Sequence, residues 1–112
     1  MSDRPPTQAV ILAGGRGARL RPLTDTLPKP LIPIHGRPFL SYLLEQVKDS
    51  GIDDVLLLVG YLAGMIREYC GDGSRWGLRI RCVESPVEAE TGQRLRDAAP
   101  LLAPHFLLMY CD

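Results

Sequence analysis

The sequence predicts an α/β domain of three layers (α/β/α), in which helices cover both faces of a mostly parallel sheet. Apolar runs of strand length alternate along the chain with amphipathic stretches of helical length. The runs at 55–59 and 106–110 are continuously apolar, which is typical of parallel strands buried on both faces. Strands that alternate with helices favour right-handed crossovers within one sheet.

The first part of the chain is predicted to hold one strand and little regular helix. Residues 1–7 are polar and proline-bearing, so we expect a loose tail before the domain at 8–112. The first strand is predicted at 8–13. A short helical turn is expected within 20–26, because the nearby prolines prevent a long helix. Proline also limits the apolar segment 30–34 to a short edge strand.

An amphipathic helix is predicted after a turn at 35–37. It begins with proline, a favoured first helical residue, and ends at Gly51. Apolar side chains recur four residues apart at Phe39, Leu43 and Val47, with Leu40 and Leu44 beside them. This spacing indicates a helix that packs one face on the sheet.

The middle of the chain is predicted to give a buried strand and a second helix. Residues 55–59 are apolar throughout and are followed by glycine. The helix is expected at 62–69, with Met65, Ile66 and Tyr69 on its inner face.

The last elements are an edge strand, a helix and a buried strand. Apolar and basic residues alternate at 78–83, which indicates a strand near the sheet edge. A helix is predicted at 91–99, with Thr91 as its cap. The final strand, at 106–110, is predicted to be buried. In such sheets ligands bind outside the carboxyl ends of the strands.

Composition excludes several classes of protein. The 13 basic and 13 acidic side chains give zero net charge, which argues against nucleic acid held by broad electrostatics. The three cysteines are widely spaced, so we expect reduced thiols and neither a disulfide framework nor a zinc site. No apolar run approaches membrane-spanning length and the amino terminus has no apolar leader segment. These features predict a cytoplasmic protein with no membrane partner.

A glycine loop follows the first strand and is suited to binding an anion. Gly14, Gly15 and Gly17 allow backbone N–H groups to converge, since no Cβ blocks an approaching ligand. The loop lacks the Gly-Lys-Ser/Thr ending of a Walker phosphate loop. It also lacks the third glycine of a dinucleotide fingerprint, where this chain has Ala18-Arg19-Leu20.

The pattern Gly-Gly-x-Gly-x-Arg-Leu-x-Pro-Leu-Thr at 14–24, followed by Pro28-Lys29-Pro30, resembles the sugar-1-phosphate nucleotidylyltransferase family. The resemblance implies a Rossmann-like nucleotide-diphospho-sugar transferase fold, incomplete at the carboxyl terminus, with this chain as its nucleotide-binding half. It further implies that an NTP and a sugar 1-phosphate are converted to an NDP-sugar and pyrophosphate. GTP with mannose or heptose 1-phosphate is the preferred pair, and a homo-oligomer is compatible with the family. We expect the chain to be inactive by itself.

Two basic residues are predicted to act on the phosphates. The planar guanidinium of Arg19 is suited to holding two oxygens of the leaving pyrophosphate. Lys29 stands between two prolines, which fix its backbone and pre-position its ammonium near the α-phosphate. Arg16 occupies a variable position of the family motif and is expected only to add to the positive field, whereas Arg21 is either a second contributor or a solvated neighbour. The backbone cradle for the triphosphate is assigned to Leu12, Ala13, Gly14, Gly15, Arg16 and Gly17.

The remaining site residues follow the later strands. Asp112 comes directly after the last strand, and the resemblance assigns it to Mg²⁺, which prefers oxygen ligands. Thr91 and Gly92 match a family motif that contacts base and ribose, and Ser85 is a further candidate. Other positions of that motif differ: Glu90 replaces glycine, and Gln93 and Arg94 replace small residues. These departures leave the base open and support a rival function, a non-catalytic nucleotide-binding regulatory or assembly module.

Overall fold

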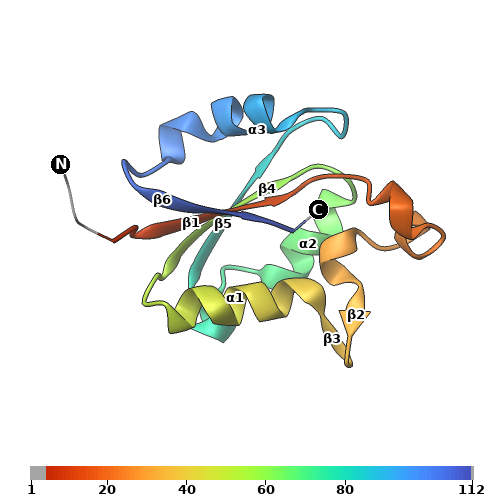
Figure 1. The fold of residues 1–112 in the computed structure, drawn as a ribbon, viewed down its shortest axis with the longest axis horizontal. Coiled ribbons are helices and arrows are strands. Elements are labelled where there is room, and N and C mark those ends of the chain that lie inside the picture. Colours follow the sequence, from red (N-terminus) through yellow and green to blue (C-terminus); the bar gives the residue numbers. More distant parts are fainter. Residues whose placement is uncertain (1–4, 112) are drawn as a thin grey trace.

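The computed structural model describes residues 5–111. Its main sheet contains four parallel strands: β1 (Gln8–Ala13), β4 (Asp54–Val59), β5 (Arg79–Glu84) and β6 (Phe106–Tyr110). The order across the sheet is β5-β4-β1-β6. Helices α1 (Phe39–Asp49) and α2 (Ala63–Cys70) cover one face, and α3 (Thr91–Ala98) covers the other (Figure 1). The predicted three-layer fold and its order of elements are confirmed.

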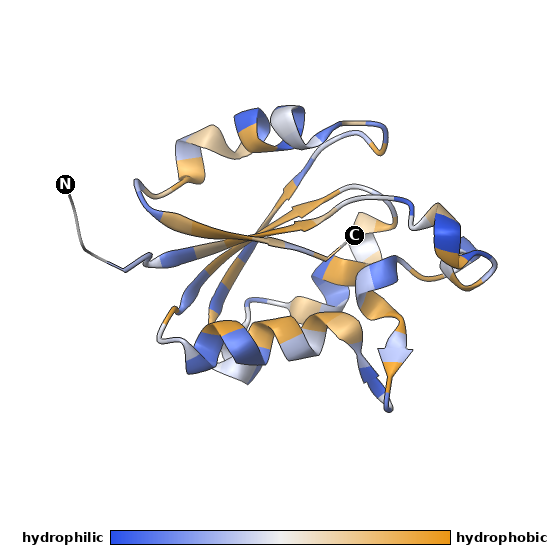
Figure 2. Cartoon of the chain, in the orientation of Figure 1, coloured by the Kyte–Doolittle hydropathy of each residue, from blue (hydrophilic) through white to orange (hydrophobic). Residues whose placement is uncertain are grey.

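The core lies on both faces of β1, because strands flank it within the sheet and helices pack on each face of the sheet. All six of its residues are buried. Alternate side chains point to opposite faces: Ile11 packs with the α1 and α2 layer, whereas Val10 and Leu12 pack beneath α3. Figure 2 shows the resulting hydrophobic band along the sheet, with hydrophilic residues on the outer faces of the helices.

The buried stripe of α1 is displaced by one residue from the predicted one. Leu40, Leu44 and Val47 are almost fully buried, whereas Phe39 and Leu43 pack at the margin of the core. Ser41 is also buried, and its hydroxyl donates to the Pro38 carbonyl at 2.7 Å. The two stripes are adjacent on the helix, so the pattern gave the helix correctly but not its rotation.

The predicted inner face of α2 is wrong at one residue. Ala63, Ile66 and Cys70 are buried, at positions that share one side of the helix. Met65 is 37% exposed, and Tyr69 is only half-buried. The helix has only eight residues, and only one side of it contacts the sheet. Met65 lies beside that contact and is partly exposed to solvent.

The predicted cap of α3 is also wrong. Thr91 is the first residue inside the helix, and the preceding residue, Glu90, has extended backbone and makes no capping hydrogen bond through its side chain. Hydroxyl residues are common both at caps and in first turns, so the sequence did not distinguish the two positions.

Strand β6 is an edge strand of the described sheet, contrary to the prediction that it is buried. Leu107 is 39% exposed and Tyr110 is 65% exposed. An apolar run indicates that a strand contacts the hydrophobic core, but it does not show whether the strand has one or two neighbouring strands.

A small hairpin, β2 (Pro33–Ile34) and β3 (Arg37–Pro38), precedes α1. His35 and Gly36 form its turn, both with positive φ, as a two-residue type I′ connection requires. Within the described residues, no helix is long and apolar enough to cross a bilayer.

Candidate functional site

The glycine loop leaves the carboxyl end of β1 and folds back through three short 3₁₀ turns, at Ala18–Leu20, Leu23–Asp25 and Lys29–Leu31. Gly17 has φ +65°, the left-handed region that glycine adopts without strain. A Cβ at this position would lie 2.9 Å from the Thr24 Cγ2 and 3.2 Å from the Lys29 Cβ. Only glycine therefore allows the loop to turn this tightly against the Pro-Lys-Pro segment.

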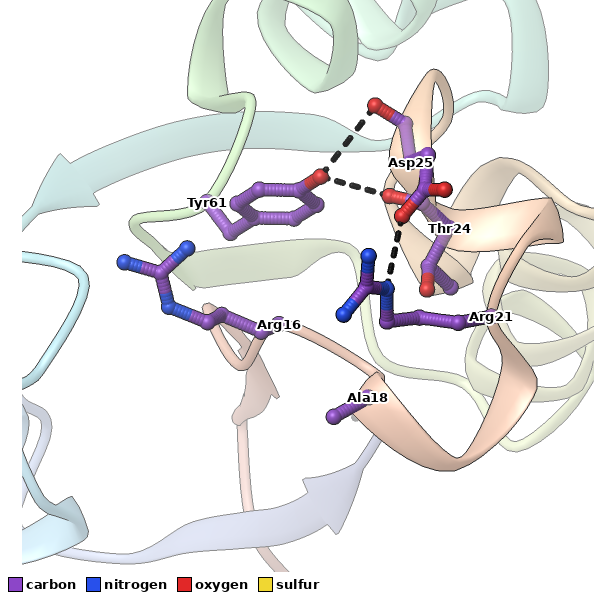
Figure 3. A pocket seen from close by; sticks show the side chains of 6 residues that line it. All are labelled: Arg16, Ala18, Arg21, Thr24, Asp25 and Tyr61. Atoms are coloured by element: carbon purple, nitrogen blue, oxygen red, sulfur yellow. Dashed lines mark hydrogen bonds and ion pairs between the residues drawn. The ribbon is translucent and has the colours of Figure 1, made fainter.

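Two residues hold the loop in place from below. The Thr24 hydroxyl, which is buried, donates to the Gly17 carbonyl at 2.9 Å. The Tyr61 N–H donates to the Gly14 carbonyl at 3.0 Å, and the Tyr61 hydroxyl donates to the Thr24 carbonyl at 2.5 Å (Figure 3). Tyr61 was not identified from the sequence. Its position just beyond a buried strand, at the same edge as the glycine loop, is the signal that would have found it.

A hollow of about 280 Å³ lies on one side of the loop, and Figure 3 shows the side chains that line it, Tyr61 among them. Arg16 and Arg21 enter it from the glycine-loop side, and the Arg16 guanidinium lies 5.8 Å from the centre of the Tyr61 ring. The Arg21 Nε donates to Asp25 at 2.9 Å. The charge of Arg21 is therefore offset by an acidic neighbour, and its side chain is largely exposed to solvent.

A second hollow, of about 370 Å³, brings the two predicted phosphate-binding side chains together. Arg19 and Lys29 line it with Gly17, Ala18 and Leu20. Ala18 also lines the first hollow, so the two lie next to each other. Arg19 is exposed, and no carboxylate among residues 5–111 forms an ion pair with it. Lys29 is flanked by Pro28 and Pro30, both buried, which anchor its backbone.

An ion pair connects the glycine loop to the loop that follows β5. The Arg16 Nη2 lies 3.0 Å from the Glu88 Oε1, and both side chains are more than half exposed. The hydrogen bond from Arg16 lowers the pKa of the Glu88 carboxyl below its ordinary value. The pair spans the two loops that the sequence assigned to the nucleotide.

Three of the predicted ligand-binding residues are buried in the protein. Leu12 and Ala13 are buried in the sheet, and the Leu12 carbonyl accepts a hydrogen bond from the Cys111 N–H at 2.8 Å. Ser85 is buried, and its hydroxyl donates to Asp97 at 2.6 Å. The side chains of these three residues therefore face the protein interior, and the assignment of Ser85 to the base stays a prediction.

Thr91 and Gly92 are exposed at the first turn of α3, which follows the loop that carries Glu88. Asp112, the predicted metal ligand, lies outside the described residues. Residues 5–111 contain no group of three acidic, histidine or cysteine side chains arranged to hold a metal ion. Asp25 and Glu88, the carboxylates nearest the glycine loop in these contacts, are paired with arginines. The described residues by themselves therefore do not fit a Mg²⁺ site.

Comparison with known proteins places this geometry in a family. A family model described as nucleotidyl transferase matches residues 8–110. The N-acetylmuramate alpha-1-phosphate uridylyltransferase of Neisseria meningitidis is 40% identical over 96 residues, which are 85% of this chain and 42% of that protein. The D-glycero-alpha-D-manno-heptose 1-phosphate guanylyltransferase of Campylobacter jejuni is 45% identical over 90 residues, 80% of this chain and 40% of that protein.

A solved structure agrees with these relatives. The crystal structure of HddC from Yersinia pseudotuberculosis complexed with GMP-PN superposes with a TM-score of 0.82 at 29% identity, covering 95% of this chain and 48% of that one. The chain thus spans less than half the length of each of these three proteins. Because the family model covers the whole sheet together with the glycine loop and the Pro-Lys-Pro segment, the chain belongs to the nucleotidyl transferase family.

Proposed function

We propose that this chain carries the nucleotide-binding part of a sugar-1-phosphate nucleotidylyltransferase. The observation that supports it most is the shared hollow of Arg19 and Lys29 beside Gly17, at the carboxyl edge of a parallel sheet. Two cations line this space beside the glycine loop, which suits a triphosphate. The related transferases named above differ in base and sugar but share nucleotidyl transfer.

In the proposed reaction, a phosphate oxygen of the sugar 1-phosphate attacks the α-phosphorus of the NTP in line. The bond from the α-phosphorus to the oxygen that bridges to the β-phosphorus breaks, and pyrophosphate leaves with that oxygen. The protein forms no covalent bond, so its contribution is positioning and charge stabilisation. Arg19 holds the leaving pyrophosphate, and Lys29 stabilises the charge that grows on the α-phosphate.

The preferred substrates and the metal are inferred from the related proteins. GTP with mannose or heptose 1-phosphate is our preferred pair, and the heptose guanylyltransferase named above supports it. Mg²⁺ is proposed from the family resemblance, with Asp112 as its ligand. Ser85, Thr91 and Gly92 are the candidates for the base and ribose, and the last two are exposed.

Nucleotide binding measured by isothermal titration tests the phosphate site. We expect Arg19→Met and Lys29→Met each to weaken GTP or UTP binding by about tenfold or more, since each loses a charge-assisted contact. Arg79→Met is the matched control, because Arg79 is exposed at the opposite, amino edge of the sheet. Unchanged affinity in both site variants would rule out this phosphate site.

Pyrophosphate release over four NTPs and a set of sugar 1-phosphates separates the enzyme from its rival. Release with any pair supports the transferase. Tight NTP binding with no release from any pair supports a non-catalytic nucleotide-binding module. The observation that favours this rival is the Arg16–Glu88 ion pair, because it occupies a cation of the phosphate loop with a protein carboxylate.

A further inference from the structure

A buried arginine lies beneath the site, and the reaction described above does not use it. Arg94, on α3, is only 3% exposed. Its Nη1 donates to the Val59 carbonyl at 2.9 Å. Its Nη2 lies within hydrogen-bonding distance of three more carbonyls, those of Gly14 at 3.3 Å, Pro86 at 3.2 Å and Val87 at 3.1 Å.

The acceptors of Arg94 are all main-chain carbonyls. No carboxylate among residues 5–111 forms an ion pair with this side chain. A guanidinium stays charged when buried, so its desolvation must be offset by hydrogen bonds. An apolar side chain of similar volume would fill the same space without that cost. The presence of arginine therefore calls for a reason beyond filling the core.

Two glycines make room for the guanidinium. A Cβ on Gly14 would lie 2.4 Å from the Arg94 Nη1, and a Cβ on Gly60 would lie 2.7 Å from the same atom. The guanidinium plane is thus pressed against the backbone where β1 and β4 end. A shorter or branched side chain on α3 does not reach this position and contact all four carbonyls.

The four carbonyls belong to three segments, and the Arg94 side chain contacts all three. Gly14 begins the glycine loop, Val59 ends β4, and Pro86 and Val87 belong to the loop that carries Glu88. In a trans peptide the C=O and the next N–H point in opposite directions. Drawing the Gly14 carbonyl inward therefore aims the following N–H away from Arg94, on the outer side of the loop.

We propose that Arg94 is a positioning residue that fastens the glycine loop and the loop after β5 to each other, and so sets the spacing between the two walls of the nucleotide site. The inference rests on the proposed function, since the walls are those assigned to the triphosphate and to the base. A planar fork with several donors suits this task, whereas lysine supplies the charge without the fork.

Hydrogen exchange with mass spectrometry tests the fastening without any nucleotide. In Arg94→Lys and Arg94→Met we expect residues 14–17 and 85–90 to exchange about tenfold faster or more, with β1 and β4 unchanged. Arg79→Met is the control and is expected to match the wild type. Unchanged exchange at both loops in a folded variant overturns the proposal. Loss of folding in both Arg94 variants also overturns it, because Arg94 is then required by the fold as a whole.

Ligand titration tests the consequence for the site. A nucleotide spans both walls, whereas inorganic tripolyphosphate contacts only the glycine loop. We expect Arg94→Lys to weaken NTP binding by about tenfold and tripolyphosphate binding by less than about threefold. A merely structural role would weaken both alike, and that result counts against positioning. If the wild type binds no NTP, the proposed function fails while the exchange experiment still judges Arg94. If the wild type binds and Arg94→Lys binds equally well, only the inference about Arg94 fails.

Discussion

Gly17 shows how one position combines backbone conformation and close packing. Its positive φ and its contact with Thr24 and Lys29 place the Pro-Lys-Pro segment against the glycine loop. The neighbouring glycines are not equivalent to it. Gly14 has an ordinary φ, and it is required because the Arg94 guanidinium lies directly beneath it.

Gly17→Ala is expected to lower the free energy of unfolding by about 1–2 kcal/mol, because alanine is strained in the left-handed conformation and its Cβ clashes with Thr24. Gly64→Ala is the matched control, because Gly64 lies in α2 with open space around its Cα. Alanine there is expected to stabilise the protein by about 0.5 kcal/mol. Urea denaturation followed by circular dichroism measures both. Equal effects of the two substitutions would contradict this account of Gly17.

Cys70 is a buried thiol whose ionisation is suppressed. Cys70 is the last residue of α2, and its side chain lies in the core. Burial raises the pKa of the thiol to about 12. At pH 8 the thiolate fraction is therefore only about one in ten thousand. We expect iodoacetamide to modify Cys70 far more slowly in the native protein than in urea, as measured by peptide mass spectrometry. Rapid native labelling would show that this part of the core opens freely.

The same pKa shift fixes the sign of a pH effect. The unfolded chain releases the Cys70 proton near the ordinary value of 9.0, whereas the folded protein keeps it until about pH 12. The stabilisation is complete below pH 9 and is lost as the pH rises toward 12. Denaturation midpoints are therefore expected to fall across this range.

At the scale of elements, α2 illustrates the difference between pattern and packing. Ile66 is fully buried against the sheet, whereas its neighbour Met65 is 37% exposed. Both are apolar, so the sequence placed them on one inner face. The direction in which an eight-residue helix turns toward the sheet depends on the neighbouring elements.

Ile66→Ala is expected to cost about 2–4 kcal/mol of stability, because it removes buried methyl groups and leaves a cavity. Met65→Ala, the matched truncation on the same helix, is expected to cost less than about 1 kcal/mol. Chemical denaturation midpoints compare the two. A larger loss at Met65 would mean that α2 packs with the opposite rotation.

At the scale of the whole molecule, the distribution of charge matters more than its total. The chain is formally neutral, yet four basic side chains project from the segment 16–29 at the carboxyl edge of the sheet. Glu88 reaches this region from another loop and offsets part of that charge.

Glu88→Gln is expected to tighten NTP binding by about two- to fivefold at low salt, because it frees Arg16 and removes a negative charge beside the triphosphate. The gain is expected to shrink at high salt. Glu45→Gln is the control, since Glu45, on α1, also pairs with an arginine, Arg37 of β3, and the Glu45 side chain is about half exposed. Isothermal titration at two salt concentrations measures the difference. Weaker binding in Glu88→Gln would show that the ion pair supports the site instead of competing with the ligand.

The four main strands and the three helices could be predicted from the sequence alone. Strands buried on both faces have continuous apolar runs, and the helices have apolar side chains at helical spacing. These features are local, so neighbouring residues suffice to define them. The family that the glycine-loop pattern resembles is the one that the comparisons show.

Only the tertiary structure decided which groups meet. The roles of Tyr61 and Arg94 depend on contacts across 37 and 80 residues of sequence, to Thr24 and Gly14, which no local pattern records. The structure also decided that Ser85 bonds to Asp97 and that Met65 faces solvent. Side-chain partners depend on how the helices pack on the sheet. The same helical spacing of apolar residues is compatible with more than one rotation of the helix about its axis.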